Sequence, residues 1–237
     1  MVSVDSRFKD ILDKHPCHLY SPKGLAEGID PFKALASGII SQQVSGAAAR
    51  SITRKFILLF TDPIDEEGSP PKDYFPTPQH VLTKKVEDLR TAGLSGRKAE
   101  YILDLSARFS DGRLNAEDMV HDSDEQIIEK LVEVRGIGQW SISRTWQDFL
   151  IIGAEMFLMF ALKRPDVLST GDLGIQRGMA IWTGKNIANA KGKTGKWKYM
   201  SEQDMLAEGE KWRPYRSIGA WCMWRVDRTV SAPAVIA

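Results

Sequence analysis

The sharpest chemical pattern in this chain is a Gly-Ile-Gly turn between two helical segments, within residues 131–140. Gly136 and Gly138 allow a tight reversal of the backbone, and Ile137 can fill the gap between the two helices. Backbone N–H groups of the turn then lie at a helix N-terminus, where they can bind a phosphate group. An ordinary connection between antiparallel helices is the alternative. Carbonyl groups near the turn could also hold a monovalent cation, Na⁺ or K⁺, and the candidates are those of Val132, Val134 and Ile137.

A second candidate for phosphate binding is the stretch from Leu173 to Met200, which contains no acidic residue. The formal net charge of the whole chain is only +1, so the distribution of charge is more informative than its sum. This stretch is either a solvated basic loop or a phosphate-facing patch, and the sequence favours neither. Its basic residues are Arg177, Lys185, Lys191, Lys193, Lys196 and Lys198.

Composition excludes several classes of protein. Hydrophobic residues make up 43% of the chain, which is enough to bury a core. Its two cysteines, Cys17 and Cys222, provide no disulfide framework and no zinc or iron–sulfur spacing. The longest apolar stretch, residues 149–162, is interrupted by Glu155 and is too short to span a bilayer. We therefore expect a soluble, intracellular protein with no membrane partner.

Helical periodicity and capping signals position these candidates, and no stretch shows sustained strand alternation. Asp30 and Pro31 predict an N-cap followed by proline at the first helical position. Ser123 and Gln126 predict a capping box. The pattern therefore predicts an all-α protein with two helical lobes and a cleft between them. Further helices are expected at residues 45–60, 98–109 and 214–226, with breaks at 61–77 and 93–96.

Five blocks of sequence, taken together and in order, resemble the helix-hairpin-helix DNA glycosylases, above all the 3-methyladenine type that removes alkylated bases from DNA. The resemblance covers roughly residues 30–226. It leaves residues 1–29 as an N-terminal extension and residues 227–237 as a C-terminal tail. The blocks are Asp30-Pro31-Phe32 through Ser41-Gln42-Gln43-Val44-Ser45, Gly136-Ile137-Gly138-Gln139-Trp140, Ala154-Glu155-Met156-Phe157, Gly171-Asp172-Leu173-Gly174-Ile175-Gln176-Arg177, and Trp212-Arg213-Pro214-Tyr215-Arg216-Ser217 through Trp224.

The resemblance implies that Asp172 is the catalytic carboxylate. An N-glycosidic bond breaks through a cationic, oxocarbenium-like sugar, and a carboxylate beside it stabilises that charge. A bare N-cap of the helix starting at Leu173 is the alternative for Asp172, and both roles can hold together. Relatives that cut the strand have a lysine where this chain has Trp140, so we expect a monofunctional enzyme that leaves an abasic site.

Such an enzyme must flip its target nucleotide out of the duplex. The resemblance implies a base pocket of Trp140, Met156 and Trp224, whose indole faces favour a positively charged alkylated purine through cation–π attraction. Gln43 takes the position of the wedge that fills the hole left by the flipped base. The full set of expected DNA-binding residues is Gln43, Ser45, Gly136, Ile137, Gly138 and Gln139.

The sequence therefore predicts a monofunctional glycosylase for alkylated purines such as 3-methyladenine. A glycosylase-like protein that binds damaged DNA without cutting it is one alternative, and a glycosylase for deaminated or mismatched bases is another. We expect double-stranded DNA with damaged bases as partner, a monomer, and no required cofactor beyond the optional Na⁺ or K⁺. The expected compartment is the nucleus in a eukaryote and the cytoplasm otherwise.

Residues 142–153 depart from the family pattern, because in relatives Trp140-Ser141 would lead directly to Ala154. Such a segment fits a retained intron translated in frame, a gene-model error or a genuine variant. As continuous helix it would displace the following residues by about 18 Å and rotate them by about 120°. We therefore predict that the core survives and that the insert is expelled near the second helix of the hairpin.

Overall fold

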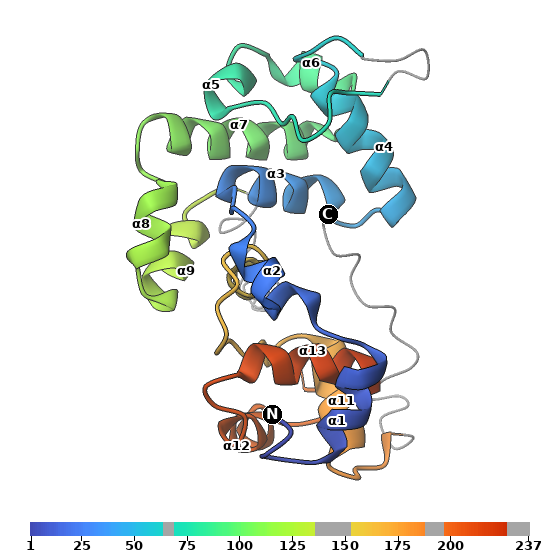
Figure 1. Ribbon diagram of the computed structural model, residues 1–237. Helices are drawn as coiled ribbons and strands as arrows, with labels where there is room; N and C mark the ends of the chain where they lie inside the picture. Colours follow the sequence, from blue (N-terminus) through green and yellow to red (C-terminus); the bar gives the residue numbers. More distant parts are fainter. Residues whose placement is uncertain (64–68, 136–152, 188–196, 227–237) are drawn as a thin grey trace. The chain divides into compact units, whose positions relative to one another are not determined.

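A computed structural model describes residues 1–63, 69–135, 153–187 and 197–226 of the chain (Figure 1). Helices and their connections account for all of the secondary structure in these ranges, as the sequence predicted. No helix in this part of the chain is both long and apolar enough to cross a membrane. The chain divides into two compact units, and each is described by itself.

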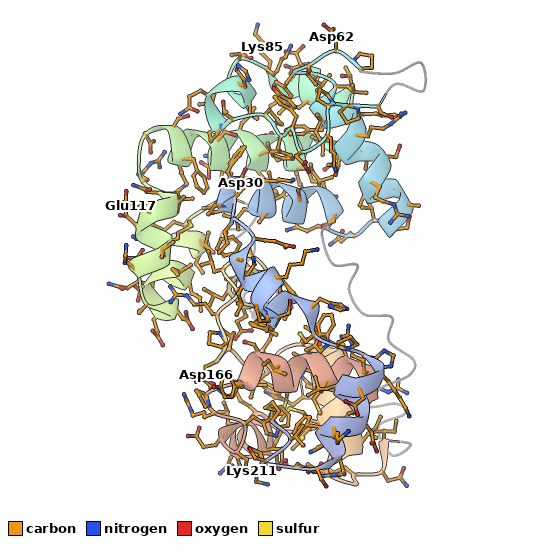
Figure 2. The ribbon with its side chains drawn as sticks, viewed as in Figure 1. Asp30, Asp62, Lys85, Glu117, Asp166 and Lys211 are labelled. Carbon is orange, nitrogen blue, oxygen red and sulfur yellow. The ribbon has the colours of Figure 1, made fainter. Side chains whose placement is uncertain are left out.

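The first, which we call the central unit, comprises the described residues between 30 and 135. It contains α3 (Pro31–Ser41), α4 (Gly46–Ile57), α5 (Pro78–Val81), α6 (Val86–Arg90), α7 (Gly96–Ser110), α8 (Ala116–His121) and α9 (Asp124–Val132). Helix α7 packs against α3, α5 and α6, so it forms the centre of this unit (Figure 1). Charged side chains such as Asp62, Lys85 and Glu117 lie at its surface (Figure 2).

The predicted helix starts of the central unit are confirmed. The Asp30 side chain accepts a hydrogen bond from the backbone N–H of Lys33 at 2.9 Å. Ser123 and Gln126 form the reciprocal capping box, with distances of 3.3 and 2.8 Å. The core lies on the apolar faces that the periodicity indicates, and on α3 these buried residues include Phe32, Leu35, Ala36, Ile39 and Ile40.

The second, which we call the terminal unit, joins residues 1–29 to the described residues from 153 onwards. It contains α1 (Arg7–Lys14), the short η1 (His18–Tyr20), α2 (Pro22–Ala26), a helical stretch at residues 153–160, α11 (Leu173–Trp182), α12 (Glu202–Glu210) and α13 (Arg216–Val226). Helix α13 packs against α11, α1 and α12 (Figure 1).

Residues 1–29, which the resemblance leaves as an extension, contribute to the core of the terminal unit. Phe8 of α1 is fully buried and lies 4.5 Å from Trp182 between ring centroids. Its ring also meets Trp212 edge-on at 5.9 Å. Burial of these large aromatic surfaces stabilises the unit by the hydrophobic effect.

The helical stretch at residues 153–160 begins at Gly153, the last residue of the predicted insert. Its apolar side chains at Phe157, Leu158 and Met159 are buried, so the core beyond the insert is intact. Residues 142–152 of the insert lie outside the described residues, and the route that it takes stays a prediction.

Candidate active site

Asp172 is the N-cap of α11 and therefore lies at the positive end of a helix of ten residues. Its Oδ1 accepts a hydrogen bond from the backbone N–H of Ile175 at 2.7 Å. The capping role that the sequence suggested is thus confirmed. A cap of this kind fixes the carboxylate in one orientation, which a catalytic group also requires.

A second donor reaches the same oxygen from α13. The indole Nε1–H of Trp224 donates to Oδ1 of Asp172 at 2.9 Å. Among the described residues, Oδ2 of Asp172 has no hydrogen-bond partner, and the side chain is half-buried. One carboxylate oxygen is therefore held by two N–H groups, while the other has no partner in the described part of the chain.

Trp224 is itself held in place. Its ring stacks on Phe160 with centroids 5.6 Å apart and an interplanar angle of 22°, and the residue is only 3% exposed. The resemblance assigns Trp224 to the base pocket, and the structure adds a contact with the carboxylate that the sequence did not indicate. A buried indole packed in this way fixes the direction from which its N–H group approaches Asp172.

Glycine on α11 makes this approach possible. A Cβ at Gly174 would lie 2.8 Å from Cδ1 of Trp224 and 3.1 Å from Oδ1 of Asp172, closer than side chains pack. One turn later, a Cβ at Gly178 would overlap the backbone carbonyl of Met223. The two glycines therefore let α13 lie close enough to α11 for the tryptophan to reach the carboxylate.

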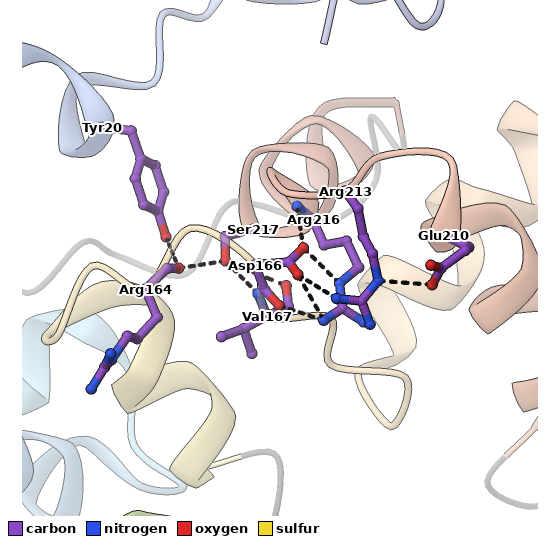
Figure 3. A network of polar contacts seen from close by, with 8 residues as sticks. All are labelled: Tyr20, Arg164, Asp166, Val167, Glu210, Arg213, Arg216 and Ser217. Atoms are coloured by element: carbon purple, nitrogen blue, oxygen red, sulfur yellow. Dashed lines mark hydrogen bonds and ion pairs between the residues drawn. The ribbon is translucent and has the colours of Figure 1, made fainter. Parts of the chain in front are cut away.

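The loop that leads to Asp172 is tied to the start of α13 (Figure 3). Oδ1 of Asp166 accepts from Nε of Arg216 at 2.8 Å, and Oδ2 accepts from Arg213 at 2.6 Å. Burial alone would raise the pKa of Asp166, but the hydrogen bond and charge of Arg216, with help from Arg213, lower it overall. Asp166 is therefore a loop residue paired with two neighbouring basic groups.

Ser217 fastens the same loop from its other side (Figure 3). Its hydroxyl donates to the Arg164 carbonyl at 2.7 Å and accepts from the Val167 N–H at 3.0 Å. Tyr20 donates to the Arg164 carbonyl as well, at 3.1 Å. Because the loop is bonded along its length, the position of Asp172 depends on α13 through more than Trp224.

Of the other two residues predicted for the base pocket, the structure describes only one. Met156 lies half-buried on the helical stretch at residues 153–160. Trp140 lies outside the described residues, so its assignment to the base pocket stays a prediction. Three further tryptophans, Trp182, Trp212 and Trp221, are buried and belong to the core of the terminal unit.

Two of the predicted DNA-binding residues lie in the central unit, where α3 ends and α4 begins. Gln43 is exposed and has a φ of +55°, a left-handed conformation that costs a non-glycine residue about 1 kcal/mol or more. Ser45 is also exposed and caps α4 by accepting from the N–H of Ala48 at 3.2 Å. Gly136, Ile137, Gly138 and Gln139 lie outside the described residues.

The segment that enters the hairpin is described as far as Arg135. Helix α9 ends at Val132, and the backbone N–H of Arg135 donates to Oδ2 of Asp104 at 2.9 Å. The carbonyl of Glu133 accepts from Arg108 at 2.7 Å, so it is already engaged. The carbonyls proposed for Na⁺ or K⁺, at Val132 and Val134, lie on either side of it, and carbonyl oxygens are ligands that such ions accept. No cluster of carboxylate, thiol and imidazole groups suited to a metal occurs in the part of the chain that the structure describes.

Some basic side chains of residues 173–200 already contact other groups of the protein. Lys185 pairs with Asp204, and both Arg177 and Lys198 lie over the ring of Tyr199, at 5.8 and 5.4 Å from its centroid. Lys191, Lys193 and Lys196 lie outside the described residues. A phosphate-facing role for the stretch stays a prediction.

Comparison with known families decides where the chain belongs. The profile of the HhH-GPD superfamily, described as base excision DNA repair proteins, matches residues 36–196. The chain belongs to the HhH-GPD superfamily. This match confirms the resemblance noted in the sequence.

Individual relatives agree with the superfamily match. The DNA-3-methyladenine glycosylase of Saccharomyces cerevisiae is 33% identical over 218 residues, an alignment that covers 84% of this chain and 68% of that protein. The crystal structure of DNA-3-methyladenine glycosidase from Bacillus halodurans matches with a TM-score of 0.65 and 31% identity, over 96% of this chain and 88% of that one. The Bacillus subtilis protein YfjP is 29% identical over 194 residues, and this chain spans 58% of its length.

Proposed function

We propose that this HhH-GPD protein is a monofunctional DNA glycosylase that hydrolyses the N-glycosidic bond of alkylated purines such as 3-methyladenine. The observation that carries the proposal is the state of Asp172: Oδ1 is held by two N–H donors, and Oδ2 has no hydrogen-bond partner among the described residues. The names of the similar proteins support alkylated bases as the substrate class.

In the proposed reaction the damaged base leaves with the bonding electrons, and positive charge develops on the sugar. The Asp172 carboxylate stabilises that charge electrostatically through Oδ2, while its N–H contacts prevent it from turning away. Water then adds to the cationic sugar carbon and gives up a proton to the solvent, which leaves an abasic site. Trp140 stands where strand-cutting relatives have lysine, so no Schiff base forms and the strand stays intact.

Binding of double-stranded DNA belongs to the same proposal. The hairpin at residues 136–139 would hold a backbone phosphate, Gln43 would fill the gap left by the flipped nucleotide, and Ser45 would lie beside it. Na⁺ or K⁺ on the carbonyls of Val132, Val134 and Ile137 would add positive charge next to that phosphate. Such a protein acts as a monomer where genomic DNA is found, which is the nucleus in a eukaryotic cell.

The test is direct. Purified protein is incubated with duplex DNA treated with a methylating agent, and free bases are separated by chromatography while abasic sites are counted. We expect release of 3-methyladenine, an equal number of abasic sites and no strand breaks before alkaline treatment. Tight binding to the damaged duplex without base release would instead favour a damage-binding protein, and release of only deaminated or mismatched bases would change the substrate class.

A further inference from the structure

Two helix ends and two residues between them make up the segment that carries Gln43. Helix α3 ends at Ser41 with Gln42 as its C-cap, and Ser45 is the N-cap of α4. Gln43 and Val44 are therefore the whole connection, and both side chains are exposed. A connection this short takes its conformation from how its two helix ends are held.

The end of α3 is held by a residue of another helix. Nζ of Lys98, in the first turn of α7, donates to the backbone carbonyl of Ile40 at 2.7 Å and to that of Gln42 at 2.6 Å. The hydroxyl of Ser41 donates to earlier carbonyls of the same helix, those of Ser37 and Gly38. Lys98 thus engages the carbonyl immediately before Gln43.

The placement of this cation does not benefit its own helix. A positive charge in the first turn of α7 lies at the wrong end of that helix's dipole, whereas the same charge at the C-terminus of α3 is favourable. Burial lowers the pKa of Lys98, and the described residues give it no carboxylate partner. The two carbonyls of α3 are therefore what offsets the cost of placing an ammonium group there.

The backbone of the next residue, Gln43, has an unusual conformation, which anchoring of the connection on both sides would explain. Gln43 adopts a φ of +55°, which glutamine seldom does without support from its surroundings. With the Gln42 carbonyl fixed by Lys98 and the Ser45 hydroxyl capping α4, both sides of Gln43 are anchored.

We propose that Lys98 is a positioning residue for the Gln43 wedge: it fixes the end of α3 so that the exposed Gln43 side chain is preset for insertion into the duplex. The inference rests on the proposed function, because it takes Gln43 as the residue that fills the gap left by a flipped nucleotide. Lys98 itself does not touch DNA in this account.

The test measures insertion separately from base release. A duplex carries a stable abasic-site analogue, with 2-aminopurine as the neighbouring base, and its fluorescence rises when the wedge disturbs the stack. We expect Lys98→Met to reduce the rise at saturating protein to less than one third of the wild-type value, about the effect of Gln43→Ala. In the double variant the two changes should not add, because the first already removes the ordered wedge.

The matched control is Lys163→Met, since Lys163 likewise donates to two helix-end carbonyls, those of Gly24 and Glu27, but in the terminal unit. Any effect of that change should add to the effect of Gln43→Ala. Lys98→Arg, which can still donate to both carbonyls, should restore at least half of the rise. This rescue covers the case in which Lys98→Met fails to fold.

Four results would overturn the inference. A fluorescence rise in Lys98→Met equal to that of the wild type would reject the role of Lys98 and leave the Gln43 wedge in place. Strict additivity between Lys98→Met and Gln43→Ala would do the same. So would a lack of rescue in a Lys98→Arg protein that melts like the wild type. If the wild-type protein causes no fluorescence rise, both the wedge role of Gln43 and the positioning role of Lys98 would be rejected. If the wild-type protein causes the fluorescence rise but releases no base, the result would count against the proposed catalysis and leave the Lys98 inference supported.

Discussion

At the scale of single residues, the site depends on one carboxylate oxygen held by two N–H donors. Asp172 would be a cap like many others if only the Ile175 contact were present. The Trp224 contact adds a donor from a helix far along the chain and leaves Oδ2 as the oxygen available for chemistry. Trp224 therefore positions the carboxylate, in addition to its predicted place in the base pocket.

Replacing Trp224 with phenylalanine tests that role, because it keeps an aromatic ring against Phe160 and removes the N–H donor. We expect single-turnover base release to slow by about 10- to 100-fold, the equivalent of a hydrogen bond to a charged group worth about 1.5–3 kcal/mol. Trp221→Phe is the matched control on the same helix, since the buried Nε1 of Trp221 has no hydrogen-bond partner in the described part of the chain. Equal rates for the two variants would show that the Trp224 N–H is not used.

At the scale of elements, the close approach of α11 and α13 determines whether the site can form. Gly174→Ala would place a methyl group against the indole of Trp224. We expect a loss of about 1–3 kcal/mol in the free energy of unfolding, together with slower base release, because the indole must shift away from Asp172. Denaturant unfolding and the base-release assay measure the two effects.

A control for the loss of glycine itself is Gly38→Ala on α3. A Cβ there meets no atom within 4 Å, so alanine should stabilise the helix by up to about 1 kcal/mol. Destabilisation by Gly38→Ala, or no destabilisation by Gly174→Ala, would contradict the packing described for α11 and α13.

The loop before the site should make stability depend on pH in the acid range. The pKa of Asp166 lies below its ordinary value of 3.8, so the ionised carboxylate stabilises the fold at higher pH, and this contribution is lost as pH falls through the lowered pKa. Asp166→Asn should lower the melting temperature by about 2–6 °C near neutral pH. The difference from wild type should shrink below pH 3.8.

Asp13→Asn is the control for that measurement, because Asp13 pairs with Lys9 on the open surface and exposed pairs contribute little. A gap between wild type and Asp166→Asn that stays constant from neutral to acid pH would show that ionisation of Asp166 is not involved.

Local signals in the sequence predicted the elements well, and long-range contacts account for what they could not predict. The caps at Asp30 and Ser123, and the cap at Asp172, follow from residue types at fixed spacing. The contact from Trp224 to Asp172 joins residues that only the packing of α11 on α13 brings together. The glycines at positions 174 and 178, on the helix that follows the carboxylate, are local signs that something packs closely there.

For the whole molecule, the sequence predicts one departure from the family pattern, an insert at residues 142–153. The buried side chains of residues 157–159 show that the core downstream of it is kept. An expelled insert would expose apolar residues between Trp146 and Ile152, which favours aggregation. We therefore expect deletion of residues 142–153 to raise both the melting temperature and the rate of base release. A deletion form that is less stable and less active would show that the insert belongs to the fold.

If Asp172 carries the chemistry, removal of its charge alone should nearly stop base release. Single-turnover release of 3-methyladenine is measured for wild type and for Asp172→Asn, with binding of each to a duplex containing an abasic-site analogue. Asparagine keeps the size of the side chain and an oxygen for capping but removes the charge. Release should therefore slow by at least about 100-fold, with DNA binding largely unchanged. Release within a few-fold of wild type would contradict it.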